Sequence, residues 1–139
     1  MAVMVSVNAG PKKVHTIGDS TMATYATDGS TDKRGWCQFL QQFFNAENVK
    51  VNNRGKSGAD TRQFYNTLWA SVKSQMKAGD YVLIQFAHND EGTVTYGTDN
   101  LELAAYNQAN GLPALTDARG TCPYSTYRDM LRTYIDEAR

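Results

Sequence analysis

Three short polar segments of the chain hold the residue types that acyl transfer requires. They are the Gly-Asp-Ser of residues 18–20, the glycine-bearing loop 53–60 and the His-Asn-Asp of residues 88–90. A serine hydroxyl can attack an ester carbonyl, while backbone N–H groups near a glycine and an asparagine amide can bind the oxyanion that forms. Each segment follows an apolar run, and three such segments in succession indicate a hydrolytic site more strongly than one does.

Each segment also has an ordinary structural interpretation. Residues 19–20 could cap a helix, Gly58 could simply form a turn, and residues 89–90 could form an Asx turn after a strand. The GDSTM stretch differs from the G-x-S-x-G nucleophile elbow because Met22 stands where the second glycine would be. This difference argues against the α/β-hydrolase superfamily.

The composition predicts an ordinary single-domain protein and no charged partner. Of 139 residues, 41% are hydrophobic, and 14 basic residues balance 14 acidic ones. This balance gives no support for binding nucleic acid or a membrane surface, and no apolar run reaches the about 18 residues of a membrane span. The chain has two histidines and two cysteines, Cys37 and Cys122, in no zinc-binding spacing, so we expect no metal and no cofactor. Whether the cysteines are bridged stays open.

The N-terminal segment has two interpretations. Residues 1–10 are small and apolar, as at the end of a secretory signal peptide cleaved after Ala9, or they form a disordered extension. The first interpretation predicts a secreted or periplasmic protein.

Periodicity predicts strands that alternate with helices. Apolar runs predict strands at 13–18, 49–52 and 80–87, and helical spacing predicts helices at about 35–46, 60–79 and 124–139. Such alternation favours a parallel sheet, in which ligands gather at the carboxyl ends of the strands. The third strand is almost continuously apolar, as in a sheet covered on both faces. The polar stretch 92–123 is expected to be a functional or disordered loop.

The helical patterns also predict which side chains are buried. Trp36 and Phe39 are expected in the core, and Arg62 is expected in solvent at the start of its helix, although it could contact a sugar or acid group. The buried face of the helix 60–79 is expected to consist of Phe64, Leu68, Val72 and Met76.

Four motifs, IGDSTM, RGWCQFL, VNNRGKSGADTRQF and GDYVLIQFAHND, follow one another between about residues 13 and 90. In order and spacing they resemble the SGNH (GDSL-like) hydrolases, and among them the rhamnogalacturonan acetylesterase-like carbohydrate esterases. The resemblance implies a three-layer α/β/α, flavodoxin-like parallel sheet. It also implies a serine esterase that removes acetyl groups from a polysaccharide such as rhamnogalacturonan or pectin.

The resemblance also assigns roles to residues. Ser20 would be the nucleophile, and its own N–H would face the oxyanion. Gly58 would supply the second N–H, because it lies five residues after Asn53, and Asn89 would supply the side-chain donor. Supporting positions in the same loops are Asp19, His88 and Asp90.

The family's general base comes from a D-x-x-H motif that this sequence lacks. His15 lies on the same strand as Ser20, about 16 Å away at about 3.3 Å per residue, and is expected to be a packed strand residue. His88 is on the correct side of the sheet and could form a substituted dyad. We therefore expect residues 11–139 to be the N-terminal part of a single SGNH domain, truncated after the third strand and the following helix and weakly active alone.

Other interpretations stay open. A second chain, or a swapped copy in a dimer, could cover the apolar edge of the third strand. The chain could instead be a non-catalytic carbohydrate-binding or assembly module on this scaffold, or a lipase or thioesterase.

Overall fold

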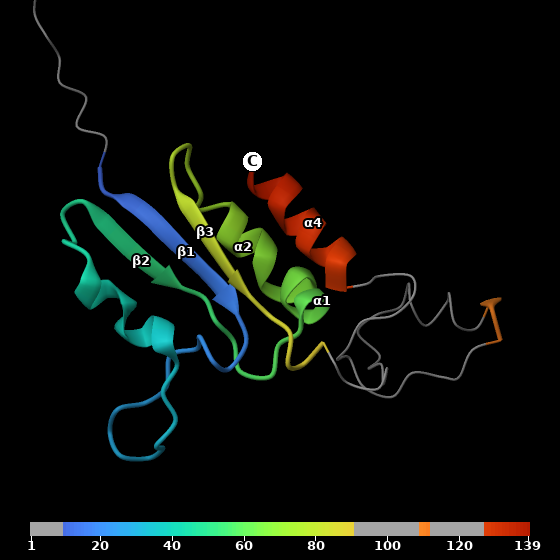
Figure 1. Cartoon of the computed structure of the whole chain (residues 1–139), viewed down its shortest axis with the longest axis horizontal. Coiled ribbons are helices and arrows are strands. Elements are labelled where there is room, and N and C mark those ends of the chain that lie inside the picture. The colour runs from blue at the N-terminus through green and yellow to red at the C-terminus, as the bar shows by residue number, and fades with distance from the viewer. Residues whose placement is uncertain (1–9, 91–108, 112–126) are drawn as a thin grey trace, which may run out of the picture.

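A computed structural model describes residues 10–90, 109–111 and 127–139. Its centre is a sheet of three parallel strands, β1 (Lys12–Gly18), β2 (Val49–Asn53) and β3 (Tyr81–Gln85). The strand order is β2-β1-β3, with β1 in the middle (Figure 1). The predicted parallel α/β sheet is confirmed, and this order is that of the first three strands of a flavodoxin-like fold.

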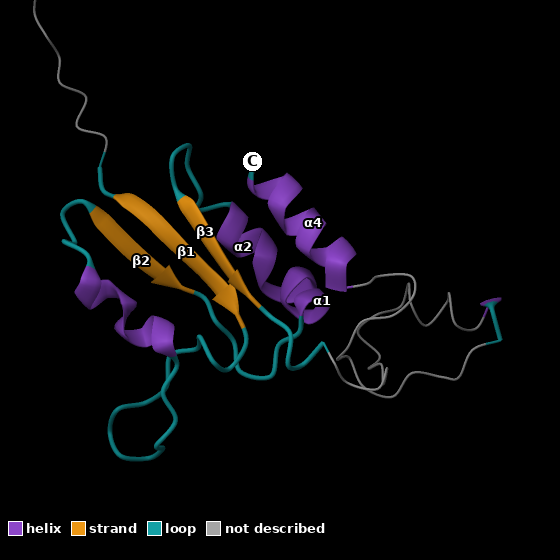
Figure 2. Cartoon of the chain, viewed as in Figure 1, coloured by secondary structure: helices purple, strands orange, loops and turns teal. Residues whose placement is uncertain are grey.

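Helical segments lie on both sides of the sheet (Figure 2). The 3₁₀ helix η1 (Trp36–Phe43) joins β1 to β2. One continuous helix joins β2 to β3 and consists of α1 (Thr61–Phe64), a π-helical turn η2 (Tyr65–Trp69) and α2 (Ala70–Lys73). Helix α4 (Tyr127–Ala138) packs beside it.

The main core lies between the sheet and the helices α1, η2, α2 and α4. Tyr134 of α4 is fully buried; its ring packs edge-on against Trp69 and stacks on Phe86, with centroids 4.9 Å and 5.9 Å away. Its hydroxyl donates to the carbonyl oxygen of Thr61 at 2.6 Å. The buried residues of this core are Ile17, Ala59, Phe64, Trp69, Val72, Phe86, Met130 and Tyr134.

The π-helical turn changes the face predicted for the second helix. Phe64 and Val72 are buried as expected, but Trp69 is buried where Leu68 was predicted, and Leu68 is only partly buried. A π turn bonds residues five apart, so a residue five positions after Phe64 returns to the same face. The helix is capped at its N-terminus by Asp60, whose side chain accepts the Gln63 N–H at 2.6 Å.

The prediction for Arg62 is wrong. Its side chain lies at the start of α1 but is only 5% exposed. The first turn of α1 lies beneath the loop that follows β3, where the Asp90 carboxylate accepts hydrogen bonds from Thr61. This packing removes the helix start from solvent.

The prediction for residues 35–46 is also wrong in two respects. The segment is a 3₁₀ helix of eight residues, and the supposed core residues Trp36 and Phe39 are 44% and 43% exposed. A 3₁₀ helix has about 3.0 residues per turn instead of 3.6, so the apolar stripe turns away from the sheet. Cys37 is the buried residue of η1, and burial raises the pKa of its thiol. Cys122 lies outside the described residues.

Strand β3 is shorter and less covered than its sequence predicts. Val82 and Ile84 pack against the main core, whereas Tyr81 and Leu83 on the other face are 65% and 40% exposed. Within the described part of the sheet β3 pairs with β1 alone, so it is an edge strand. Within the described structure, one face of β3 packs against the core and the other is exposed, which differs from the predicted cover on both faces.

Candidate active site

The loop after β1 is a turn rather than the start of a helix. Oδ1 of the buried Asp19 accepts the backbone N–H and the hydroxyl of Thr21, both at 2.8 Å. Asp19 therefore caps this turn, and there is no helix after Ser20 for residues 19–20 to cap. No hydrogen bond from the Ser20 hydroxyl is found within the described residues, so its side chain has no capping role there.

Two further groups fix the peptide of Ser20. The Tyr25 hydroxyl donates to the Ser20 carbonyl oxygen at 2.9 Å. Gln38 of η1 holds Tyr25 in turn, since its Oε1 accepts the Tyr25 N–H at 3.2 Å and its Nε2 donates to the Tyr25 carbonyl at 3.0 Å. The serine peptide is thus attached to η1 through Tyr25.

A chain of side-chain hydrogen bonds connects the serine turn to β3 and η1. The Gln85 amide donates to the Thr21 hydroxyl, and Gln85 Oε1 accepts the Trp36 indole N–H at 2.7 Å. The Trp36 backbone N–H also donates to the Thr21 carbonyl oxygen at 2.9 Å. Trp36 is therefore partly exposed yet held at both of its N–H groups.

The loop after β2 packs against the serine turn. Asn53 Nδ2 donates to the Met22 carbonyl oxygen at 2.8 Å, and Asn53 Oδ1 accepts the Gly55 N–H at 3.1 Å. A Cβ on Gly55 would lie 2.8 Å from Ala23 N, so only glycine fits this approach.

Gly58, further along the same loop, is in a different environment. It has a positive φ of 78° and open space around the position of a Cβ. No acceptor for its N–H is found in the described parts of the chain, whereas the Gly55 N–H is bound by Asn53. This difference favours Gly58 over Gly55 as an oxyanion donor.

The loop after β3 is tied to the start of α1. Asn89 Nδ2 donates to the Ala59 carbonyl oxygen at 2.9 Å. The Asp90 carboxylate accepts the Thr61 hydroxyl at 2.6 Å and the Thr61 N–H at 3.1 Å. Burial raises the pKa of Asp90, and the Thr61 hydrogen bonds counteract part of this effect. Asp90 thus fixes the position of its loop.

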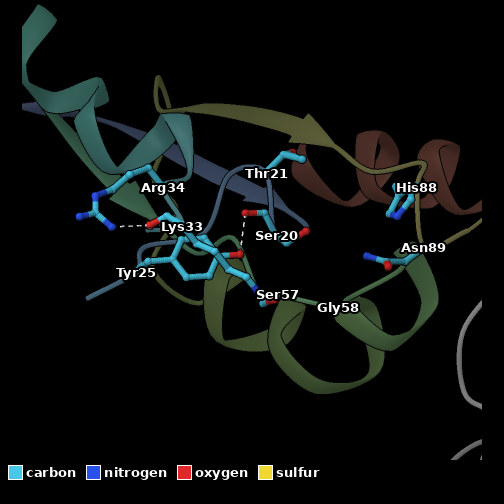
Figure 3. Close-up of a pocket in the computed structure, with 9 residues that line it drawn as sticks. All are labelled: Ser20, Thr21, Tyr25, Lys33, Arg34, Ser57, Gly58, His88 and Asn89. Atoms are coloured by element: carbon cyan, nitrogen blue, oxygen red, sulfur yellow. Dashed lines mark hydrogen bonds between the residues drawn. The ribbon is translucent and has the colours of Figure 1, made fainter. Parts of the chain in front are cut away.

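The three loops meet in one pocket of about 420 Å³ (Figure 3). The sequence-predicted residues Ser20, Gly58, Asn89 and His88 all line it. The other supporting residues, Asp19 and Asp90, are buried in the adjacent loops. Five further lining residues have no role predicted from the sequence. Tyr25, Lys33 and Arg34 lie in a segment with only the composition of a polar turn. Thr21 and Ser57 lie within the quoted motifs but are not assigned a role there.

The two histidines differ in position. His15 is buried in β1, where Nε2 lies 3.4 Å from Asp80 Oδ2 and Nδ1 lies 3.0 Å from Asn52 Nδ2. The prediction of a packed strand residue is confirmed. His88 lines the pocket, but no hydrogen bond joins it to Ser20 in the described structure.

Within the residues that the structure describes, no helix is long and apolar enough to cross a membrane. The same residues contain no group of three or more His, Cys, Asp or Glu side chains that could hold a metal ion.

The chain belongs to the GDSL-like Lipase/Acylhydrolase family, whose sequence model matches residues 16–139. A 20%-identical crystal structure, that of the protein YxiM from Bacillus subtilis, has the same fold, with a TM-score of 0.62 over 92% of this chain and 29% of that one.

Curated relatives point to a particular group within the family. The chain is 32% identical over 130 residues to the rhamnogalacturonan acetylesterase RhgT of Bacillus subtilis, covering 93% of this chain and 44% of RhgT. It is 29% identical to the probable rhamnogalacturonan acetylesterase YesY of the same organism, covering 91% of this chain and 48% of YesY. A rhamnogalacturonan acetylesterase of Emericella nidulans is 30% identical over 83 residues, 59% of this chain and 30% of that protein. The chain thus spans less than half the length of these relatives.

Proposed function

We propose that this chain carries the nucleophile and the oxyanion donors of a serine esterase. The observation that carries the proposal is the single pocket to which the loops after β1, β2 and β3 bring Ser20, Gly58 and Asn89 (Figure 3). Ser20 Oγ attacks the ester carbonyl carbon, the alcohol leaves with a proton, and an acyl-enzyme remains. Water then hydrolyses the acyl-enzyme to the free acid and restores the serine.

Three N–H donors are assigned to the oxyanion in this proposal. They are the backbone N–H groups of Ser20 and Gly58 and the side-chain amide of Asn89. One N–H of the Asn89 amide donates to Ala59, which orients the amide and leaves the other N–H for the substrate. Losing one such donor typically lowers turnover by about 10²–10³-fold. The mechanism uses no metal and no cofactor.

The proposed substrate is an acetylated polysaccharide such as rhamnogalacturonan or another pectin. The names of the relatives support this choice. A lipase or thioesterase is the competing enzyme class, and p-nitrophenyl esters of increasing acyl length distinguish the two. An acetylesterase prefers acetate, whereas faster hydrolysis of long acyl chains would overturn the proposed substrate.

A serine hydroxyl also needs a base, and no side chain among the described residues is hydrogen-bonded to the Ser20 hydroxyl. His15 is held in the sheet by Asp80 and Asn52, and His88 makes no hydrogen bond to Ser20 in the described structure. We therefore propose that the chain alone hydrolyses esters slowly. The same observation favours one alternative, a non-catalytic carbohydrate-binding or assembly module on this scaffold.

Serine-directed labelling tests the proposed function. The chain and its Ser20→Ala variant are incubated with a fluorophosphonate probe and, separately, with p-nitrophenyl acetate. Labelling and hydrolysis that both disappear in the variant support the esterase. Absence of labelling in the unmodified chain, together with retained binding of an oligosaccharide, would establish the module instead.

A second variant decides the role of His88. General-base catalysis typically contributes about 10²–10⁴-fold to the rate. Because His88 makes no hydrogen bond to Ser20 in the described structure, we expect His88→Ala to change the rate of p-nitrophenyl acetate hydrolysis by far less than this. A loss as large as that of Ser20→Ala would instead make His88 the base of a substituted dyad. Circular dichroism of both variants controls for folding.

We also propose that the protein is exported to the periplasm or the medium. The small, apolar composition of residues 1–9, which lie outside the described residues, supports this. Mass spectrometry of protein recovered from the periplasm or the medium of its source organism tests the proposal. A mature N-terminus at Gly10 supports export, and an uncleaved protein found in the cytoplasm contradicts it.

A further inference from the structure

We propose that Tyr127 and Tyr134 of α4 are positioning residues for Asn89, the side-chain donor assigned to the oxyanion. The Tyr127 hydroxyl binds the backbone just before the loop of Asn89, and the Tyr134 hydroxyl binds the residue that holds the end of this loop. The inference rests on the proposed function, because it concerns how the assigned donor is held.

Asn89 lies in a tight turn after β3. The Asp90 N–H donates to the Ala87 carbonyl oxygen at 2.8 Å, which closes the turn around residues 88 and 89. Within the described residues, the Asn89 side chain makes one hydrogen bond, from Nδ2 to the Ala59 carbonyl oxygen at 2.9 Å. One such bond does not by itself fix the direction of the second N–H. That direction therefore depends on how the two ends of the turn are held.

Tyr127 holds the start of the turn. Its hydroxyl donates to the Phe86 carbonyl oxygen at 2.7 Å. Phe86 is 4% exposed, and its ring stacks on that of Tyr134 with the centroids 5.9 Å apart. The residue at which the chain enters the turn is thus held by α4 through a hydrogen bond and through ring packing.

Tyr134 holds the end of the turn through Thr61. The Tyr134 hydroxyl donates to the Thr61 carbonyl oxygen at 2.6 Å, and the Thr61 hydroxyl and N–H donate to the Asp90 carboxylate at 2.6 Å and 3.1 Å. All three residues are buried. In a buried network each group has few other partners, so the position of Tyr134 constrains that of Asp90, the residue after Asn89.

Both tyrosine hydroxyls stay protonated and can donate at neutral pH. Burial raises the pKa of Tyr127 and of Tyr134, and the nearby carboxylate of Asp90 adds to both effects. A donor stabilises an oxyanion only when it lies within about 2.7–3.1 Å of that oxygen. Helix α4 lies beside α1 (Figure 1) and adds no residue to the described lining of the pocket. It would nevertheless influence the reaction by holding Asn89 at this distance.

The mobility of the Asn89 side chain tests the inference without any reaction. Its amide order parameter is measured by ¹⁵N NMR relaxation in the unmodified chain, in Tyr127→Phe and in Tyr134→Phe. Each variant loses one hydroxyl and keeps the ring. Tyr65→Phe is the matched control, because the Tyr65 hydroxyl is also hydrogen-bonded, to Glu137 at 2.5 Å, but is not bonded to the loop of Asn89. The Asn89 signal is assigned by its absence from Asn89→Asp.

We expect an order parameter near the rigid value of about 0.85 in the unmodified chain and in Tyr65→Phe. In Tyr127→Phe and Tyr134→Phe it should fall toward the flexible range, below about 0.6. An unchanged value in either variant would overturn the role of that tyrosine, and an equal fall in Tyr65→Phe would overturn both. Tyr127 is only partly buried, so its variant still gives a result if Tyr134→Phe unfolds.

Fluorophosphonate labelling of Ser20 connects this mobility to the reaction. Tyr127→Phe should slow labelling by about tenfold, a fraction of the about 10²–10³-fold cost of losing a donor. In an Asn89→Ala background the same substitution should have almost no effect, because the donor that it positions is absent. A full effect in that background would overturn the inference. If the unmodified chain is not labelled at all, the proposed esterase fails, whereas the order parameter still decides whether α4 holds Asn89.

Discussion

At the scale of single residues, the proposed nucleophile depends on neighbours that hold its backbone. Asp19 caps the turn by accepting two hydrogen bonds from Thr21, and Tyr25 binds the carbonyl oxygen of Ser20 itself. The Ser20 hydroxyl is left out of this network. Because Asp19 and Tyr25 hold the backbone of the turn, the Ser20 hydroxyl has no structural hydrogen bond to break. It is therefore available in the pocket for attack on a substrate.

Tyr25→Phe tests the role of Tyr25 in holding the serine turn, because it removes only the hydroxyl that binds the Ser20 carbonyl oxygen. We expect the free energy of unfolding to fall by about 1 kcal/mol, the usual contribution of one hydrogen bond. Fluorophosphonate labelling of Ser20 should slow as well, since the serine peptide loses a restraint. Tyr81→Phe is the control, because Tyr81 is 65% exposed and lies on β3 outside the pocket. Equal labelling rates in the two variants would contradict the positioning role of Tyr25.

At the scale of secondary structure, one carboxylate of helix α4 contacts three side chains of the helix of residues 61–73. Glu137 accepts the Tyr65 hydroxyl at 2.5 Å, the Trp69 indole N–H at 2.8 Å and the Lys73 ammonium at 2.6 Å. The hydrogen bond from Lys73, followed by that from Tyr65, lowers the pKa of Glu137 to about 2, and the Trp69 bond adds to the effect. Three helical segments, α2, η2 and α4, thus meet at a single ionised group.

This carboxylate makes stability depend on pH. Because the pKa of Glu137 is lower in the folded chain than the ordinary glutamate value of 4.5, the stabilisation is complete above about pH 4.5 and is lost as the pH falls toward 2. Glu137→Gln should lose about 1 kcal/mol at pH 7 and show a smaller further loss between pH 7 and pH 3 than the unmodified chain. Urea unfolding at both pH values measures this.

Asp136→Asn provides the matched control, because it removes an exposed carboxylate from the same helix. It should leave the pH dependence unchanged. If the two variants show the same pH dependence, the Glu137 contacts do not carry the effect.

The elements differ in how far the sequence predicts them. The strands follow from apolar runs, which tertiary contacts scarcely alter. The 3₁₀ form of η1 and the π turn at Tyr65–Trp69 are not predicted from the sequence. A stripe of apolar residues does not show whether a helix has 3.0 or 3.6 residues per turn, or whether one turn bonds residues five apart. The positions of Ser20, Gly58 and Asn89 in one pocket follow from parallel strands. Lys33 and Arg34 were not predicted, since their loop has no motif.

At the scale of the whole molecule, apolar side chains remain exposed on the η1 side of the sheet. Tyr81 and Leu83 are exposed on the edge strand β3, and Trp36 and Phe39 are partly exposed on η1. Edge strands with exposed apolar side chains are sites of association between chains. We propose that a second copy of the chain binds there.

The double variant Tyr81→Thr with Leu83→Thr tests this association. We expect it to shift the chain toward monomer in sedimentation velocity at a given concentration, with a modest loss of stability, because Tyr81 and Leu83 are 65% and 40% exposed. Ile135→Thr is the control, since Ile135 of α4 is 43% exposed on a different element. An unmodified chain that is already monomeric would contradict the proposal, as would an Ile135→Thr variant that shifts equally.

The bonds between Trp36, Gln85 and Thr21 have a practical consequence. The chain contains two tryptophans, one buried in the main core and one half exposed and linked through the Gln85 side chain to Thr21, the residue beside Ser20. Their fluorescence can be separated, because acrylamide quenches the exposed indole and spares the buried one. The emission of Trp36 therefore serves as a built-in optical reporter of the serine turn, whose response to a bound ligand can be followed in real time without an added dye.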